Sequence, residues 1–420
     1  MVKKKTKNPP YLSHEFVIQN HADIVACVAM VFVVGLMFQV SSPLASVFIV
    51  MQHNTTANVE TMPGVFQDLP FYTAGLKDVP AVFFYLLISV VMHAIIQEYL
   101  LDKVNKKLHL SKVKFNKFNE SGQLLAFYLV SLFWGGDLIL RENLLNVASI
   151  WEGYPHNNMT FLFKFFFIIQ ISYWLHIFPE LYFQKTKKED MPPKIQYAVL
   201  YLAFIVASYV FRFTRLALVL LVIHYLAETV FHICRILAYS EKTSISSKLF
   251  KLGDLLFVLA RLSSVILAVL TFWFGLAKLP AEQQSLDIAA GNFNTGLIRL
   301  NSLIAVCFLQ AWLMWNFIVF QVSDNIFVLS TLVAVKCMRV NRILDTESSK
   351  VIDWLNVKFY DCISLFNILL SSVQEDEGDE AEHQRRLRIC HEDEEDRAGE
   401  GQGQEAEAGA GGQGRRSARG

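Results

Sequence analysis

Long stretches of apolar residues, separated by short polar ones, fill most of the chain before Gln321. A helix needs about 20 mostly apolar residues to cross the hydrocarbon core of a bilayer, and eight stretches come close to that length. The pattern predicts an all-α, polytopic membrane protein with about eight spans. The predicted spans are Ile24–Val50, Val79–Leu101, Gln123–Leu140, Thr160–Phe183, Ile195–Phe211, Leu216–Ala238, Leu255–Ala277 and Leu297–Phe320.

Two of these spans depart from the usual length. Ile24–Val50 is long and contains Pro43, which disrupts helical hydrogen bonding, so this span is expected to kink or to end early. Ile195–Phe211 is short, and a short span thins the bilayer around it. Among the loops only Met51–Asp78 is long, so no segment outside the membrane before Val322 is expected to bury a core of its own.

The distribution of Lys and Arg predicts the orientation of the chain. The loops on the side of the N-terminus carry 17 of these residues, and the loops on the other side carry 5. Because basic loops stay in the cytosol, both termini are expected to be cytosolic. With this topology the sequon at Asn54 lies in the lumen and is the expected glycosylation site. The sequon at Asn158 is lumenal but adjoins a span, and the one at Asn119 is cytosolic.

The composition agrees with a membrane protein. Hydrophobic residues make up 53% of the chain and charged residues only 18%, whereas a soluble domain carries about 25% charged residues. The net charge of zero conceals an acidic C-terminal segment, which holds 14 acidic and 7 basic residues from Glu375 onward. None of the 6 cysteines belongs to a C-x-x-C pair, so neither a disulfide framework nor a metal site is predicted.

Six blocks of sequence between about residue 2 and Gln321 match one family in the same order. They are LSHEFVIQNHADIVACVAMVF (12–32), VFFYLLISVVMHAIIQEYLLDKVNKK (82–107), KFNESGQLLAFY (117–128), YWLHIFPELYFQKTKKED (173–190), HYLAETVFHICR (224–235) and GNFNTGLIRL (291–300). In these blocks the chain resembles the translocating chain-associated membrane proteins of the endoplasmic reticulum.

The resemblance implies a role beside the Sec translocon channel, where this family helps signal sequences and transmembrane segments to enter the channel and the adjacent lipid. It implies no enzymatic activity and no cofactor. It also implies a TLC domain, shared with ceramide synthases, in which a ring of helices surrounds a lipid-accessible cavity. The expected division is a cytosolic tail at 1–23, two spans with a lumenal loop at 24–116, the TLC domain at 117–321, and an atypical, acidic, largely disordered cytosolic tail at 322–420.

Polar and ionisable residues inside the predicted spans are the candidate site residues. An Asp, Lys or Arg at the middle of a spanning helix costs roughly 2.5–3.5 kcal/mol on an insertion scale, so such groups are expected to point inward or to pair. A spacing of four residues places side chains on one face of a helix. The candidates are His93, Gln97 and Glu98 in the second span, His176 and Glu180 in the fourth, and His224, Glu228 and His232 in the sixth.

Three interpretations of these residues are open at this point. They could form a hydrogen-bonded network between helices, contact lipid headgroups or a polar segment of a nascent chain, or serve metal or acid–base chemistry. His224 and His232 lie about 12 Å apart along their helix, so a single metal ion cannot contact both.

An enzymatic role, as a TLC-type acyltransferase, is an alternative, and so is lipid transport or sensing. Ceramide synthases have adjacent histidines in a span. This chain contains no adjacent pair of histidines, and its fifth predicted span contains no histidine. The best general base for acyl transfer near neutral pH is therefore missing, and the chain is predicted not to be an enzyme.

The predicted mechanism is physical. A groove of mixed polarity, lined by His93, His176, His224 and Glu228, would hold the polar flank of a signal sequence while apolar faces accept its core. The expected partners are the Sec translocon channel, nascent signal sequences and transmembrane segments, phospholipid and the ribosome, with no nucleic acid. The N-terminal cluster Lys3–Lys7 suits anionic lipid or the ribosome.

Two side-chain contacts are also predicted. Lys164 lies near the lumenal end of the fourth span and is expected to extend its ammonium group to the interface. Glu228 is expected to tie the sixth span to the fourth through His176.

Overall fold

The computed structural model describes residues 13–62, 64–240 and 243–344. The chain divides into two units, Met1–Phe320 and Gln321–Gly420, and the sites described below lie in the first. By length and composition, seven helices of the described residues can cross a membrane. This confirms the prediction of a helical, polytopic membrane protein.

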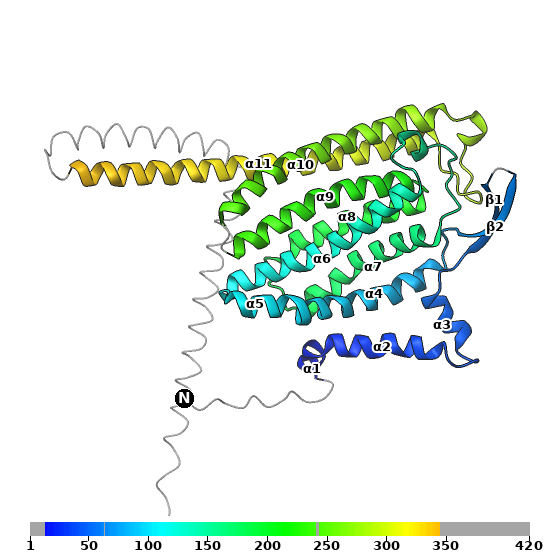
Figure 1. Cartoon of the computed structure of the whole chain (residues 1–420), viewed down its shortest axis with the longest axis horizontal. Coiled ribbons are helices and arrows are strands. Elements are labelled where there is room, and N and C mark those ends of the chain that lie inside the picture. Colours follow the sequence, from blue (N-terminus) through cyan, green and yellow to red (C-terminus); the bar gives the residue numbers. More distant parts are fainter. Residues whose placement is uncertain (1–12, 63, 241–242, 345–420) are drawn as a thin grey trace, which may run out of the picture. The chain divides into compact units, whose positions relative to one another are not determined.

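The elements that build the first unit are drawn in Figure 1. They are α1 (His14–Gln19), α2 (His21–Gly35), α3 (Ser42–Ile49), β1 (Asn54–Met62), β2 (Val65–Tyr72), α4 (Asp78–Ile95), the π-helical turn η1 (Ile96–Leu101), α5 (Asp102–Leu108), α6 (Lys112–Arg141), η2 (Val147–Ile150), α7 (Phe161–Phe183), α8 (Met191–Val210), α9 (Thr214–Tyr239), α10 (Thr243–Val269), the π-helical turn η3 (Leu270–Gly275), η4 (Leu276–Lys278), η5 (Ala281–Gln283) and α11 (Gly296–Leu344).

The first predicted span is not a single helix. α2 ends at Gly35, and α3 begins seven residues later at Ser42, with Pro43 in its first turn. Proline is favoured there because the first turn needs no N–H donor and its fixed φ suits a helix start. The Ser41 hydroxyl donates to the Gly35 carbonyl at 2.8 Å and satisfies the exposed end of α2. α2 still packs along α4, where Ala29 meets Phe84 and Leu87.

The loop between α3 and α4 contains a β-hairpin that the sequence analysis did not predict. β1 and β2 pair antiparallel, with Asn54 opposite Tyr72, and Gly64 between the strands has φ +78°. The hairpin is anchored at its base because the backbone of Tyr72 exchanges two hydrogen bonds with Met159, at 2.9 and 3.0 Å. The end of the bundle that carries this hairpin is called the hairpin end below (Figure 1).

Two helices form the centre of the bundle. In α7 and α9 more than half of the apolar stretch is buried, 56% and 61%, compared with 11% in α11. Phe166, Phe167 and Trp174 of α7 and Leu218 and Tyr225 of α9 are almost inaccessible. A polar link crosses this core: the Tyr225 hydroxyl donates to Gln170 at 2.7 Å, and Gln170 donates to Ser131 of α6 at 2.8 Å.

Two helix lengths differ from the prediction. α8 has 20 residues, which at about 1.5 Å per residue span roughly 30 Å, the thickness of the hydrocarbon core. The expectation of a short fifth span was therefore wrong. α11 continues past Phe320 to Leu344, because residues 321–344 contain no Gly or Pro that would end it. The rest of the predicted tail, 345–420, and residues 1–12 lie outside the described residues.

Candidate functional site

The three predicted polar residues of α9 share one face, as their spacing indicates. His224 Nε2 and His232 Nε2 each lie 3.8 Å from a carboxylate oxygen of Glu228. Glu228 and His232 are buried, with 8% and 3% of their surface exposed. α9 therefore carries a buried acid between two imidazoles, near the middle of a span.

Glu228 binds α8 and not α7. The Tyr197 hydroxyl donates to Glu228 Oε1 at 3.2 Å. The predicted contact between Glu228 and His176 was wrong, because His176 points toward α4, where its Nε2 lies 3.4 Å from His93 Nδ1. Next to Glu228, Trp174 of α7 instead stacks on Tyr201 of α8, with ring centroids 3.8 Å apart.

His224 uses both of its ring nitrogens. Nδ1 is bonded to the Arg261 guanidinium of α10, and Nε2 is bonded to the Tyr201 hydroxyl. Because a guanidinium can only donate, Nδ1 must be the acceptor and Nε2 carries the proton that is donated to Tyr201. Tyr201 in turn donates to Tyr197 at 3.5 Å, and Tyr197 donates to Glu228.

These bonds form an oriented chain that runs from the cation Arg261 through His224, Tyr201 and Tyr197 to the acid Glu228. Every link has one donor and one acceptor, whereas Arg261 Nε, which lies outside these links, is buried without a hydrogen-bond partner. A general base needs a free lone pair directed at a substrate. His224 has none to offer, because both nitrogens are occupied within the protein.

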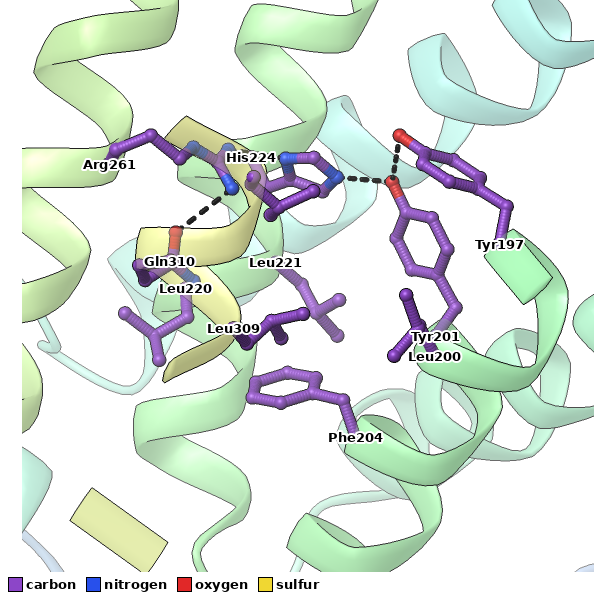
Figure 2. Close-up of a pocket in the computed structure, with 11 residues that line it drawn as sticks. Tyr197, Leu200, Tyr201, Phe204, Leu220, Leu221, His224, Arg261, Leu309 and Gln310 are labelled. Carbon is purple, nitrogen blue, oxygen red and sulfur yellow. Dashed lines mark hydrogen bonds between the residues drawn. The ribbon is translucent and has the colours of Figure 1, made fainter. Parts of the chain in front are cut away.

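A cavity opens beside this chain, between α8, α9, α10 and α11. It encloses about 490 Å³ of space that no protein atom fills, counting the open space at its mouth. Figure 2 shows Arg261, His224 and the tyrosines along one side of it, with leucine and phenylalanine side chains around the rest. The lining residues are Tyr197, Leu200, Tyr201, Phe204, Leu220, Leu221, His224, Arg261, Leu309, Gln310 and Leu313.

Arg261 and Gln310 are site residues that the sequence analysis missed. Arg261 Nη1 donates to Gln310 Oε1 at 3.0 Å, and Arg261 is only 3% exposed. Its position in the apolar run Leu255–Ala277 could have identified it as a candidate, because a charged residue inside a span is costly and by default indicates a functional site. The tyrosines of α8 gave no such signal, because aromatic residues are common throughout the chain.

A second polar cluster joins α4 and α7 toward the ends of these helices opposite the hairpin. His93 Nε2 lies 3.5 Å from Glu180 Oε1, and His21 Nε2 of α2 lies 3.8 Å from Glu180 Oε2. Gln184 donates to Glu180 at 2.9 Å. The prediction of one groove lined by four polar residues was therefore wrong. Two of them, His93 and His176, belong to the cluster between α4 and α7, and the other two, His224 and Glu228, belong to the cluster on α9. The two clusters are separate because the two helices are rotated differently about their axes. His176 and Glu180 of α7 face α4, while His224 and Glu228 of α9 face α8 and α10.

The other two candidates of the second span lie in the π-helical turn η1. Gln97 Nε2 donates to Asp102 at 2.7 Å, and Gln97 Oε1 accepts from Gln123 of α6 at 3.3 Å. Gln123 also donates to the His93 carbonyl at 3.0 Å, so α4 and α6 are tied together here. Glu98 is exposed and lies away from this contact. No cluster of metal-ligating side chains occurs among the described residues.

Lys164 does not extend to the interface as predicted. Its side chain is fully buried, and its ammonium group contacts Asp78 Oδ1 at 2.6 Å and the carbonyls of Gln52 and Thr73 at 2.8 and 2.7 Å. The Tyr209 hydroxyl donates to the other oxygen of Asp78 at 2.9 Å. The base of the hairpin covers the lysine, and this arrangement depends on contacts that are distant in sequence.

Comparison with known proteins identifies the family. The TLC domain model matches residues 117–319. The chain is 44% identical over 320 residues to human Translocating chain-associated membrane protein 2, covering 75% of this chain and 83% of that protein, and 45% identical over the same extent to the mouse protein. The chain belongs to the translocating chain-associated membrane protein family. This confirms the resemblance found in the sequence blocks.

Enzymes named for acyl transfer are more distant relatives. A sphingosine N-acyltransferase-like protein of Alternaria alternata is 25% identical over 171 residues, which is 40% of this chain and 39% of that protein. A ceramide synthase of Gibberella moniliformis is 24% identical over 213 residues, 50% of this chain and 48% of that protein. The similarity to both covers half of the chain or less.

Proposed function

We propose that this member of the family is a non-enzymatic accessory of the Sec translocon. In this proposal it assists the insertion of signal sequences, the translocation of secretory proteins and the integration of membrane proteins, in part through lipid near the lateral gate of the channel. It resides in the endoplasmic reticulum membrane as a multi-pass protein with both termini in the cytosol. The names of its relatives and the helical architecture support this proposal.

One observation carries the non-enzymatic part. His224 is the one imidazole of the buried chain from Arg261 to Glu228, and both of its nitrogens are occupied. The site next to it is an apolar cavity, not a polar cleft. Such a site favours binding of an apolar segment over bond-making chemistry, which would need a free base and a route for protons.

The partners follow from the same proposal. They are the Sec translocon channel, nascent signal sequences and transmembrane segments, phospholipid and the ribosome. The two polar clusters on α7 and α9 stiffen the bundle in this interpretation, and the surfaces around the cavity contact the client or the lipid. A hydrogen-bonded helical bundle can hold such a surface rigid beside the channel, and this role requires no covalent chemistry.

A reconstitution tests the proposal. Proteoliposomes that contain the Sec channel, with and without this protein, receive ribosome-bound nascent chains with a photoreactive residue in a weakly hydrophobic signal sequence. We expect a crosslink to the protein and more translocated product when it is present. If neither appears, while a sphingoid base and acyl-CoA yield an N-acylated product in the same vesicles, the acyltransferase alternative replaces this proposal.

A further inference from the structure

A strongly basic segment lies at the end of the bundle opposite the hairpin end. It comprises α5, the turn after it and the first two turns of α6, residues 101–118, and is called the basic extension below (Figure 1). Six lysines and one acidic residue, Asp102, give it a net charge of +5 with neutral histidine. All six lysines are exposed, and they are Lys103, Lys106, Lys107, Lys112, Lys114 and Lys117.

The basic extension is a folded part of the bundle. The Leu101 side chain packs against Gly122 of α6, where an added Cβ atom would lie only 2.4 Å from Leu101 Cδ2. Farther out, Asn105 of α5 donates a hydrogen bond to Asn119 of α6, and Phe118 is buried. A signal for membrane topology needs only basic residues in a short loop. These contacts go further, because they hold the lysines on two packed helices.

The outermost lysines of α6 stand above the membrane surface. The apolar part of α6 begins at Gln123, and Lys112 and Lys114 precede it by 11 and 9 residues. At about 1.5 Å per residue, they lie roughly 16 and 13 Å beyond the hydrocarbon core along the helix. The headgroup layer is only about 5–7 Å thick on each side, and the potential of a charged surface decays over about 8 Å at physiological salt. Lipid headgroups therefore suit the inner lysines of the extension but not the outermost two.

We propose that the basic extension binds the phosphate backbone of ribosomal RNA. Lysine ammonium groups bind phosphate oxygens as point charges, and such pairs supply most of the affinity of proteins for nucleic-acid backbones. The RNA of a ribosome docked on the channel is a polyanion that stands above the membrane, at the level that the extension reaches. This proposal departs from the expectation that no nucleic acid is a partner.

The inference rests on the proposed function, which places this end of the bundle in the cytosol beside the channel and includes the ribosome among the partners. Cosedimentation with ribosomes tests it without the channel. The full chain, in nanodiscs of phosphatidylcholine, is mixed with non-translating ribosomes that have been washed with high salt. We expect binding that weakens as potassium chloride is raised and that an excess of free ribosomal RNA displaces.

The test variant removes four exposed charges of the basic extension. It combines Lys106→Gln, Lys107→Gln, Lys112→Gln and Lys117→Gln. This variant should weaken binding by on the order of 100-fold at about 0.1 M salt, and it should reduce the slope of log K against log salt by about 3. The corresponding four changes to Arg keep the charge and should keep the binding.

A matched variant removes four exposed lysines at the same end of the bundle but outside the basic extension. They lie in the segment after α7 and near the start of α10. The variant combines Lys185→Gln, Lys187→Gln, Lys188→Gln and Lys248→Gln. Because it loses the same net charge, a change in binding below about threefold is expected only if the position of the lysines decides. An equal loss in both variants would show that binding follows net charge alone and would overturn the inference.

Two further results would overturn it. If the wild type does not bind ribosomes, the inference is wrong, and phosphatidylserine that copurifies with the wild type but not with the test variant would assign the lysines to anionic lipid. If the ribosomes bind but excess ribosomal RNA does not displace them, the contact is with an acidic ribosomal protein. Because the channel is absent, these failures are distinct from a failure of signal-sequence crosslinking, which tests the proposed function.

Discussion

Lys164 Nζ lies 2.6 Å from Asp78 Oδ1, and both side chains are buried under the hairpin end of the bundle. The pair joins the start of α4 to the first turn of α7. The two carbonyls that also accept from Lys164 belong to the segments on either side of the hairpin. One ammonium group thus fixes two helices and the base of the hairpin.

Removing one member of this pair should be far more damaging than removing both. Lys164→Met leaves Asp78 buried and unpaired, and we expect a loss of about 3–5 kcal/mol in the free energy of unfolding. Lys164→Met with Asp78→Asn should recover much of that loss. Titration of the detergent-solubilised variants with a denaturant measures the differences in their free energies of unfolding. Arg141→Met is the control: its pair with Asp137 is exposed, so a change below about 1 kcal/mol is expected. If Lys164→Met and Arg141→Met lowered the free energy of unfolding equally, the burial of Lys164 would be contradicted.

Glu228 should tolerate an amide but not a hydrocarbon. Glu228→Gln keeps an oxygen that accepts from Tyr197, so protein abundance and signal-sequence crosslinking should change little. Glu228→Leu leaves the Tyr197 hydroxyl without its acceptor in a buried site and should cost about 1–3 kcal/mol, visible as a lower steady-state level. If both variants accumulate normally and both fail to support translocation, Glu228 belongs to a functional site and not to a structural network.

The stability of the hairpin end should depend on pH through His156. This side chain is 8% exposed, outside the spans, and its pKa is lowered from 6.5 to about 4, first by burial and then by the nearby Arg215. Between pH 6.5 and about 4, His156 is protonated in the unfolded chain but neutral in the folded chain. Stability should be complete above about pH 6.5 and fall as the pH drops toward 4, by on the order of 1–3 kcal/mol. Melting temperatures of the wild type and His156→Gln at pH 7.5 and 5 test this. A wild-type curve that is no steeper than that of the variant would show that His156 does not titrate in this way.

Asn54 should carry the glycan of the chain. It is exposed at the first residue of β1, at the hairpin end. Asn119 instead lies within α6, and its side chain accepts a hydrogen bond from Asn105. Endoglycosidase treatment should shift the mobility of the wild type by one glycan, and Asn54→Gln should remove the shift. Asn119→Gln serves as the control. A glycan at Asn119 would place the opposite end of the bundle in the lumen.

The helices could be predicted closely and the contacts between them only in part. Apolar runs identified the positions of α7 and α9, because a span declares itself by its own composition. The common face of His224 and Glu228 could also be predicted, because residues four apart lie on one side of a helix. The partners of Glu228 could not be predicted, because the rotation of α8 relative to α9 is set by packing over the whole interface. Arg261 could have been recognised as a buried charge, but its neighbours Gln310 and His224 come from other helices. The hairpin was missed because two short strands in a polar loop leave only a weak local pattern.

The route from Arg261 to Glu228 has a consequence for the biosynthesis of the protein. Its members come from α8, α9 and α10, and Gln310 of α11 holds the first of them. The chain is made from the N-terminus, so α9 leaves the ribosome with His224 and Glu228 before the arginine that His224 binds has been synthesised. Tyr201 and Tyr197 of α8 are already present at that stage, but His224 Nδ1 lacks its native partner until α10 arrives. The native contacts of α9 are therefore complete only after the last helices of the unit have been delivered.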